Sequence, residues 1–258
     1  STVLFTRIQL FLIVGILTAA LLSVNIYIAY KRRPLYVPMN IEVSGVERLR
    51  AQIEPVRRWV FLGITAAVVY FAGTSGMIFW REWLQFRNST DFGVTDPQFN
   101  LDISFFAFKL PMYQALIGWG ISTLVLAALA SAFVHYMYGG IRTDVQTDRT
   151  TVAARVQISI LLGLIVLLKA VAYWFDRYAL ALQEGRLITG LTFSDVNALL
   201  PAKAILSAIA VVCSLLFFAN IIRRSWLLPA AGTALLVISS ILIAGVYPAA
   251  IQQFQVKP

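Results

Sequence analysis

One basic side chain lies deep inside an apolar stretch of this 258-residue sequence. Lys169 is about sixteen residues into the run Ala153 to Trp174, and an ammonium group at membrane depth is costly unless it is used or paired. Tyr173 and Asp176 follow four and seven residues later, on the same face of a helix. Together with Asp195 they form a candidate binding site for an anionic group. The alternative is that Lys169 reaches the outer interface or pairs with a neighbouring acid.

The other candidates favour structural roles. His135, the single histidine, lies near the end of an apolar run, which favours packing at the membrane interface over proton transfer. Asn25 is a polar residue inside another run and predicts a hydrogen bond between helices. Three aspartates of the segment 80–110 could gather around a divalent cation, but structural capping or solvation is favoured for them: Asp91, Asp96 and Asp102.

The sequence contains no pattern typical of an active site. We find no nucleophile paired with a base and no cluster of metal ligands, and we therefore expect no enzymatic activity, metal or cofactor. The single cysteine, Cys213, lies in an apolar run and reads as a small buried side chain.

Composition indicates a membrane protein. Hydrophobic residues make up 59% of the chain and charged residues only 13%, which is far from the usual soluble mixture. The net charge of +9 does not indicate nucleic acid, because the basic residues lie between apolar runs and do not gather on one face. Membrane lipids are the expected surroundings.

Six apolar runs are each long enough to cross a hydrocarbon core of about 30 Å as a helix. The sequence therefore predicts an all-α polytopic bundle that forms one transmembrane domain over residues 1–258. The fifth and sixth runs are joined by a very short turn and should be antiparallel neighbours. The predicted spans are 8–30, 59–80, 111–138, 153–174, 201–222 and 226–247.

The distribution of Lys and Arg predicts the orientation of these spans. The connections 31–58, 139–155 and 223–225 share one side and carry twelve Lys and Arg, whereas the opposite side carries eight over more residues. The first side is therefore predicted to be cytoplasmic. Ser1 and Pro258 then both face outward, and we expect one further span before Ser1.

Two loops have a recognisable character. Apolar residues between positions 46 and 60 recur at helical spacing with arginines between them, which predicts a helix at the membrane interface, broken or kinked at Pro55. The outer segment 80–110 is rich in aromatic residues and is expected to lie on the membrane surface, with residues 99–105 as a short strand or a flat stretch. Small residues four apart predict close helix packing at two places: Ala128 with Ala132, and Ser240 with Ala244.

Several motifs in order along the chain resemble one family. They are Asp91-Phe92-Gly93-Val94, Asp96-Pro97-Gln98-Phe99, Gly139-Gly140-Ile141-Arg142, Leu168 to Trp174 with Asp176-Arg177-Tyr178, and Leu200-Pro201-Ala202-Lys203. The chain is similar in these motifs to the large bacterial membrane proteins called uncharacterised protein family 0182. It departs from the expected pattern at Asn100 and Ser104, where glycine or another small residue is expected.

The resemblance implies about seven spans followed by a large extracytoplasmic domain, in the inner membrane of an actinobacterial-type cell. It implies no catalytic residues. Our hypothesis is that the chain anchors this domain and serves as a scaffold for protein partners in a cell-envelope or membrane complex. The alternative is a transporter or a lipid-handling protein that uses Lys169 and the region from Asp176 to Asp195.

Overall fold

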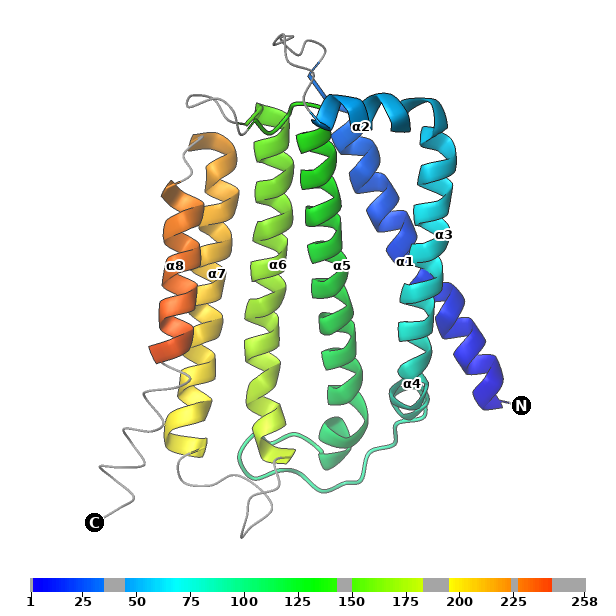
Figure 1. Cartoon of the computed structure of the whole chain (residues 1–258). Helices are drawn as coiled ribbons and strands as arrows, with labels where there is room; N and C mark the ends of the chain where they lie inside the picture. The colour runs from blue at the N-terminus through cyan, green and yellow to red at the C-terminus, as the bar shows by residue number, and fades with distance from the viewer. Residues whose placement is uncertain (1, 35–44, 143–149, 183–194, 224–226, 243–258) are drawn as a thin grey trace. The chain divides into compact units, whose positions relative to one another are not determined.

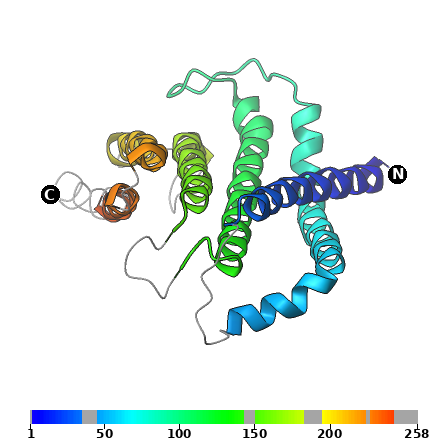
Figure 2. The same ribbon diagram turned by 90° about the horizontal axis from the view of Figure 1, so that it is seen from above.

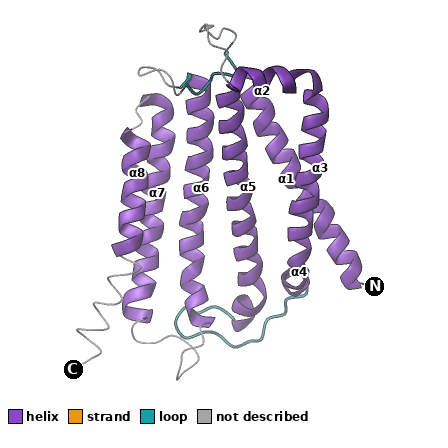
Figure 3. Cartoon of the chain, in the orientation of Figure 1, coloured by secondary structure: helices purple, strands orange, loops and turns teal. Residues whose placement is uncertain are grey.

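The computed structural model describes residues 2–34, 45–142, 150–182, 195–223 and 227–242. These residues are almost entirely helical, and Figure 3 shows helices joined by loops, with no strand in the part that is described. The prediction of an all-α fold is therefore confirmed. In chain order the elements are α1 (Thr2–Lys31), α2 (Gly45–Ile53), η1 (Glu54–Val56), α3 (Arg57–Ile78), α4 (Trp80–Arg87), η2 (Phe105–Lys109), α5 (Leu110–Met137), α6 (Val152–Ala179), η3 (Leu180–Leu182), η4 (Asp195–Leu199), α7 (Leu200–Arg223) and α8 (Leu227–Ile241).

Five helical stretches are long and apolar enough to cross a membrane. They match the first five predicted spans, with α1, α3, α5, α6 and α7 at their centres. The predicted count of six is not confirmed, because α8 covers 15 residues and the rest of the range 226–247 lies outside the described residues. Large apolar side chains on these helices are exposed, Leu4 by 63% and Leu129 by 64%, as expected for surfaces that meet lipid.

The chain divides into two compact units, and each is described by itself. Unit 1 comprises residues 1–81 and 123–161, and unit 2 comprises residues 82–122 and 162–258. Each unit therefore takes one part of α5 and one part of α6.

Glycines set the packing of α1 against α3 in unit 1, where the two helices cross (Figure 1). A Cβ at Gly15 of α1 would lie 2.7 Å from the carbonyl oxygen of Val69, and one at Gly73 of α3 would lie 2.8 Å from that of Phe11. Without Cβ atoms the two backbones approach closely, which is how helices associate where lipid surrounds them. The alanine and serine pairs singled out in the sequence do not include these glycines.

Helix α2 runs across the end of α3 and not along it, as Figure 2 shows by presenting α2 lengthwise. The change of direction occurs in η1, where Pro55 stands at the start of a short 3-10 turn. Proline ends the preceding helix because its ring lacks an N–H and clashes with the previous turn. The predicted break at Pro55 is confirmed.

Helices α6, α7 and α8 of unit 2 are joined by small polar side chains. The Ser207 hydroxyl of α7 donates to the Ala170 carbonyl of α6 at 2.8 Å, and the Ser214 hydroxyl donates to that of Gly163 at 2.9 Å. On the other side of α7, the Cys213 thiol donates to the Gly232 carbonyl of α8 at 3.1 Å. Cys213 is fully buried, as its sequence context predicted.

The loop between α4 and η2 is organised by carboxylates. Asp102 accepts backbone N–H bonds from Phe92, Gly93 and Ser104 at 3.1, 2.8 and 2.8 Å. Asp96 accepts from two further backbone N–H groups, at 2.9 and 2.8 Å, and Asp91 accepts from the Ser104 hydroxyl at 3.2 Å. The predicted capping role is confirmed. Residues 99–105 do not form the short strand that was one of the two predictions for them. The only β-type pairing in this loop is an isolated bridge between Thr95 and Asp102.

Asn100 sits at the tip of this loop with φ of 53°. That left-handed conformation favours glycine, and asparagine tolerates it better than most side chains. The expectation of a glycine at this position therefore has a conformational basis, and Asn100 meets the same requirement.

Candidate functional site

The predicted site lies on α6, α7 and α8 of unit 2. Lys169 is exposed on α6, and its ammonium lies 4.8 Å from the centroid of the Tyr173 ring. The spacing of four residues correctly predicted that these two side chains meet. An ammonium over an aromatic face gains about 0.5–1 kcal/mol at exposed sites, and more when it is desolvated.

Asp176 does not pair with Lys169. Its Oδ2 lies 2.9 Å from Nζ of Lys203, a residue near the start of α7. Seven residues along a helix correspond to about 10 Å, so Lys169 is far along the axis, whereas Lys203 comes from a neighbouring helix at the same level. Lys169 therefore contacts the Tyr173 ring, whereas Asp176 pairs with Lys203.

Tyr173 connects the members of this cluster. The Lys203 ammonium lies 5.6 Å from its ring centroid, so the ring interacts with two ammonium groups. Its hydroxyl lies 3.2 Å from Oγ of Ser240 on α8. The predicted close packing through Ser240 and Ala244 stays a prediction, because Ala244 lies outside the described residues.

Asp195, the fourth predicted residue, begins η4, the π-helical turn that leads into α7. Its side chain lies outside the described residues, so its relation to the other three stays a prediction.

The charges of the cluster leave one positive group without a carboxylate among the described residues. Asp176 neutralises Lys203, and their side chains are 34% and 23% exposed. Lys169 retains its charge next to the Tyr173 ring. The arrangement can hold one anionic group at Lys169, or it can serve only to join three helices.

Sequence reasoning missed Lys203. The available signal was its position just after the predicted start of one span, while Asp176 lies just after the predicted end of the preceding span. Consecutive antiparallel helices bring such positions to the same depth.

A second polar cluster lies in unit 1, in the interior of α1, α5 and α6. Nε2 of His135 lies 3.0 Å from Oε1 of Gln157. The Gln157 amide nitrogen donates to the Asn25 carbonyl at 2.9 Å and to the Ser131 hydroxyl at 3.1 Å. His135, Ser131 and Gln157 are all buried. The interhelical bond at Asn25 is made mainly by its backbone carbonyl, while its side-chain Oδ1 lies 3.5 Å from the same Gln157 nitrogen. His135 is buried in the last turn of α5, which agrees with the predicted packing near the end of that span.

The direction of these bonds fixes the roles of the His135 ring nitrogens. Because the Gln157 nitrogen donates to two oxygens, its Oε1 must accept, and Nε2 of His135 must carry the proton. The other ring nitrogen, Nδ1, is buried beside Gly140 with no partner in the part of the chain that is described. The imidazole therefore acts here as a single donor that holds Gln157 in place.

An aromatic cluster at the end of α6 in unit 2 contacts the loop between α4 and η2, residues 88–104, which we call the capped loop. Phe99 of the loop lies edge-on to Tyr178 of α6 at 5.0 Å, and Phe105 of η2 lies 5.5 Å from the same ring. Phe106 is 3% exposed. Edge-to-face pairs add about 0.5–1.5 kcal/mol each beyond the area they bury. The loop is thus attached to α6 by Phe99, while three of its other apolar side chains remain exposed: Phe92, Val94 and Ile103.

The described residues have the features expected of a helical membrane protein. They form an all-helical chain with five helices that can cross a membrane, and several of its buried polar groups are bonded between helices. The capped loop corresponds to the motifs from Asp91 to Phe99 on which the family resemblance rests.

The chain belongs to the Uncharacterised protein family (UPF0182), whose model matches residues 1–258. It is 47% identical over 263 residues to a UPF0182 protein of Streptomyces coelicolor, 46% over 258 residues to one of a Nocardioides species, and 43% over 258 residues to one of Frankia alni. Each comparison covers 100% of this chain but only 26%, 26% and 25% of the relative. The chain thus spans about a quarter of the length of these relatives. No solved structure matches it.

Proposed function

We propose that this chain is the membrane-embedded anchor and scaffold of a longer cell-envelope protein. In this proposal six helices span the inner membrane, with α8 as part of the sixth, and the loops 31–58, 139–155 and 223–225 face the cytoplasm. Ser1 and Pro258 then lie outside, and a further span and a large extracytoplasmic domain belong to the full protein. The protein has no enzymatic activity of its own in these helices.

The observation that carries this proposal is how the polar groups within the helices are used. Gln157 joins three helices of unit 1, and Ser207 and Ser214 join α7 to α6 in unit 2. Polar groups that line a path for a solute must instead be open to that solute. Bonding of this kind favours a rigid support.

The exposed apolar side chains of the capped loop are the surface that we propose for protein partners. Phe92, Val94 and Ile103 are 51%, 55% and 42% exposed, and the aspartates beside them hold the backbone in a fixed shape. Fixed apolar side chains bind partners at low entropic cost.

The test is purification of the full-length protein in a mild detergent, with mass spectrometry of proteins that remain bound in stoichiometric amounts. We expect a reproducible partner that is lost with the Val94→Ser/Ile103→Ser variant and kept with Val152→Ser, a residue that is 51% exposed at the start of α6. Purification without any protein partner, or a partner equally insensitive to both variants, would contradict the scaffold proposal.

A second candidate function is transport or lipid handling, and Lys169 is the observation that favours it. This exposed ammonium within a membrane-length helix contacts the Tyr173 ring and has no carboxylate partner among the described residues. If the protein moves an anionic solute or lipid in reconstituted vesicles, Lys169→Met should abolish that movement. Arg87→Gln, a change at an exposed cation at the end of α4, serves as the control. Equal activity of the two variants would remove Lys169 from consideration.

A further inference from the structure

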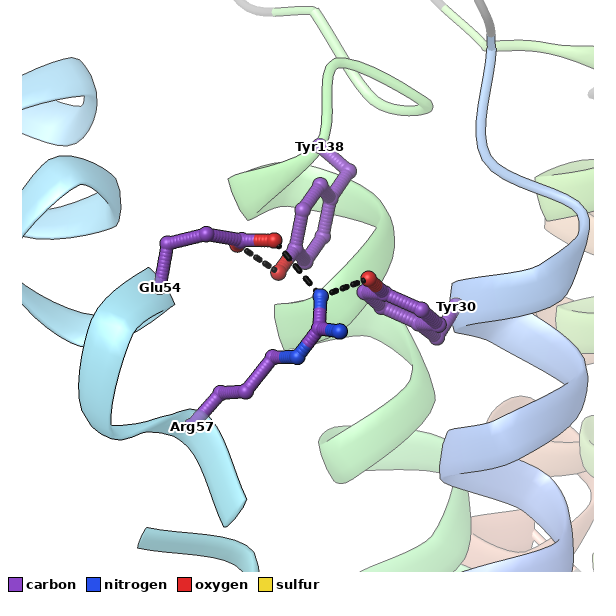
Figure 4. A network of polar contacts seen from close by, with 4 residues as sticks. All are labelled: Tyr30, Glu54, Arg57 and Tyr138. Atoms are coloured by element: carbon purple, nitrogen blue, oxygen red, sulfur yellow. Dashed lines mark hydrogen bonds and ion pairs between the residues drawn. The ribbon is translucent and has the colours of Figure 1, made fainter.

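A cluster of arginines and tyrosines lies where three helices of unit 1 end or begin. Tyr30 belongs to the last turn of α1, Arg57 begins α3, and Tyr138 follows the end of α5. The two tyrosine rings meet edge to face, with centroids 5.3 Å apart and an interplanar angle of 87°. Figure 4 shows them beside Glu54 and Arg57.

Glu54 and Arg57 form an ion pair, and each also forms a hydrogen bond with one of the two tyrosine hydroxyls. The Arg57 guanidinium donates to Oε1 of Glu54 at 2.8 Å and to the Tyr30 hydroxyl at 2.6 Å. The Tyr138 hydroxyl donates to Oε2 of Glu54 at 3.0 Å (Figure 4). Burial, followed by this bond, raises the pKa of Tyr138, which keeps the phenol protonated as a donor. Both carboxylate oxygens of Glu54 thereby accept a hydrogen bond.

Two further arginines stack on these rings. The Arg33 guanidinium lies 3.9 Å from the Tyr30 centroid and 5.1 Å from that of Tyr138, and the Arg50 guanidinium lies 4.8 Å from Tyr138. Neither forms an ion pair with a carboxylate among the described residues, and Nη1 of Arg33 is buried with no hydrogen-bond partner there. Both guanidinium groups therefore lie about 5 Å from the centre of the same ring.

The chemistry of the two stacked guanidinium groups selects a phosphate. A guanidinium whose face lies on an aromatic ring presents its N–H groups along its edge, in the geometry that binds phosphate oxygens in pairs. With Glu54 committed to Arg57 and Tyr138, the six side chains carry a net charge of two positive units. The buried, unpartnered Nη1 of Arg33 is a donor that such an oxygen would satisfy.

The position of the cluster selects the source of that phosphate. The ends of membrane-spanning helices, with their Tyr and Arg side chains, lie at the level of the lipid headgroups. Helix α2 carries Arg48 and Arg50 and runs across the end of α3, as a helix lying in the interface does. Basic segments at this level attract anionic lipids.

We propose that Arg33 and Arg50, held by Tyr30 and Tyr138, bind the headgroup phosphate of an anionic phospholipid in the leaflet on the side of loop 31–58. The site goes beyond the anchor and scaffold proposed above and shares with it only the placement in a membrane. A protein that handles no lipid as substrate would still carry it.

The experiment is native mass spectrometry of the full-length protein in detergent, titrated with dioleoylphosphatidylglycerol or with neutral dioleoylphosphatidylcholine. Arg33→Gln/Arg50→Gln should weaken phosphatidylglycerol binding about tenfold more than the control does, because it removes two guanidinium contacts to the phosphate in addition to two positive charges. The control, Arg32→Gln/Arg58→Gln, removes the same charge from two exposed positions outside the cluster and loses only the general attraction of the basic surface, about fivefold per charge at most. Phosphatidylcholine should bind weakly to all.

Equal losses for the two double variants, or equal binding of phosphatidylcholine, would overturn the site. Displacement of the lipid by millimolar inorganic phosphate would overturn the lipid assignment in favour of a soluble phosphate ligand. If Arg33→Gln/Arg50→Gln does not fold, Arg33→Lys/Arg50→Lys replaces it. That variant keeps the charge and loses the planar fork, and unchanged affinity in it would refute the proposal.

Discussion

The crossing of α1 and α3 offers the sharpest test of the fold, through the variant Gly15→Ala. An added Cβ would lie 2.7 Å from the Val69 carbonyl oxygen and 3.4 Å from Cα of Gly73. Ordinary van der Waals contact begins at 3.4 Å, and the nearer atom belongs to the backbone, so the two helices must move apart. A side chain cannot relieve this contact by rotating.

The expected cost follows from two opposing effects. Overpacking of a tight contact costs about 1–3 kcal/mol, and replacing glycine by alanine within a helix returns up to about 1 kcal/mol. We expect Gly15→Ala to lower the free energy of unfolding by about 1–2 kcal/mol. The matched control is Gly63→Ala in α3, where an added Cβ has no neighbour within 4 Å and only the favourable effect of alanine remains.

The assay is equilibrium unfolding of the full-length protein in mixed micelles with increasing dodecyl sulfate, followed by circular dichroism. Gly15→Ala should unfold at a lower denaturant fraction than the parent protein, and Gly63→Ala at the same or a higher one. Parent-like stability of Gly15→Ala would show that the close backbone approach is not required. An equal loss in Gly63→Ala would show that helix flexibility, and not the crossing, controls stability.

Three further changes test the polar contacts. Lys203→Met removes the partner of Asp176 and should cost about 1–2 kcal/mol of unfolding free energy in the same titration, a moderate value because both side chains are partly exposed. Gln157→Leu leaves the His135 Nε2 donor unsatisfied in the helix interior and should cost about 1–3 kcal/mol, and an unchanged midpoint would argue against that hydrogen bond. Asp102→Asn should speed amide hydrogen exchange in its loop, where a parent-like rate would contradict the capping role. Hydrogen bonds from Ser104, followed by those from the backbone N–H groups of Phe92 and Gly93, lower the pKa of Asp102 from 3.8 to about 2, so its contribution is complete above about pH 4 and disappears as the pH falls towards 2.

The fold could be read from the sequence wherever one signal dominated. Apolar length located five spans, because a run of that size must be buried or exposed to lipid, although α1 begins six residues before its predicted start and α6 ends five residues after its predicted end. Pro55 marked the turn between α2 and α3 for a reason of backbone geometry that acts locally. Contacts between helices were harder to predict, because Gly15 and Gly73 are 58 positions apart and nothing in their spacing shows that they meet.

In the candidate site, too, contacts within one helix could be predicted from the sequence and contacts between helices could not. The Lys169 and Tyr173 pair follows from helical periodicity alone, so it could be predicted. The partner of Asp176 depends on which helix lies beside α6, and that choice is made by packing and not by any local pattern. The arginine and tyrosine cluster contains residues from or next to α1, α2, α3 and α5, so the count of basic residues predicts a side of the membrane for it but not which side chains meet.

The two polar regions lead to different expectations for what stays bound to the purified protein. The Asp176 and Lys203 pair is internally neutral, and it leaves Lys169 as the cation of this cluster that has no carboxylate partner among the described residues. The cluster around Tyr30 and Tyr138 has one acid for three arginines, and that acid is already shared between Arg57 and Tyr138. A retained phospholipid is therefore expected at the arginine cluster even if Lys169 binds nothing. Loss of that lipid in Lys169→Met, with Arg33→Gln/Arg50→Gln unaffected, would transfer the lipid site to α6 and favour lipid handling over the scaffold.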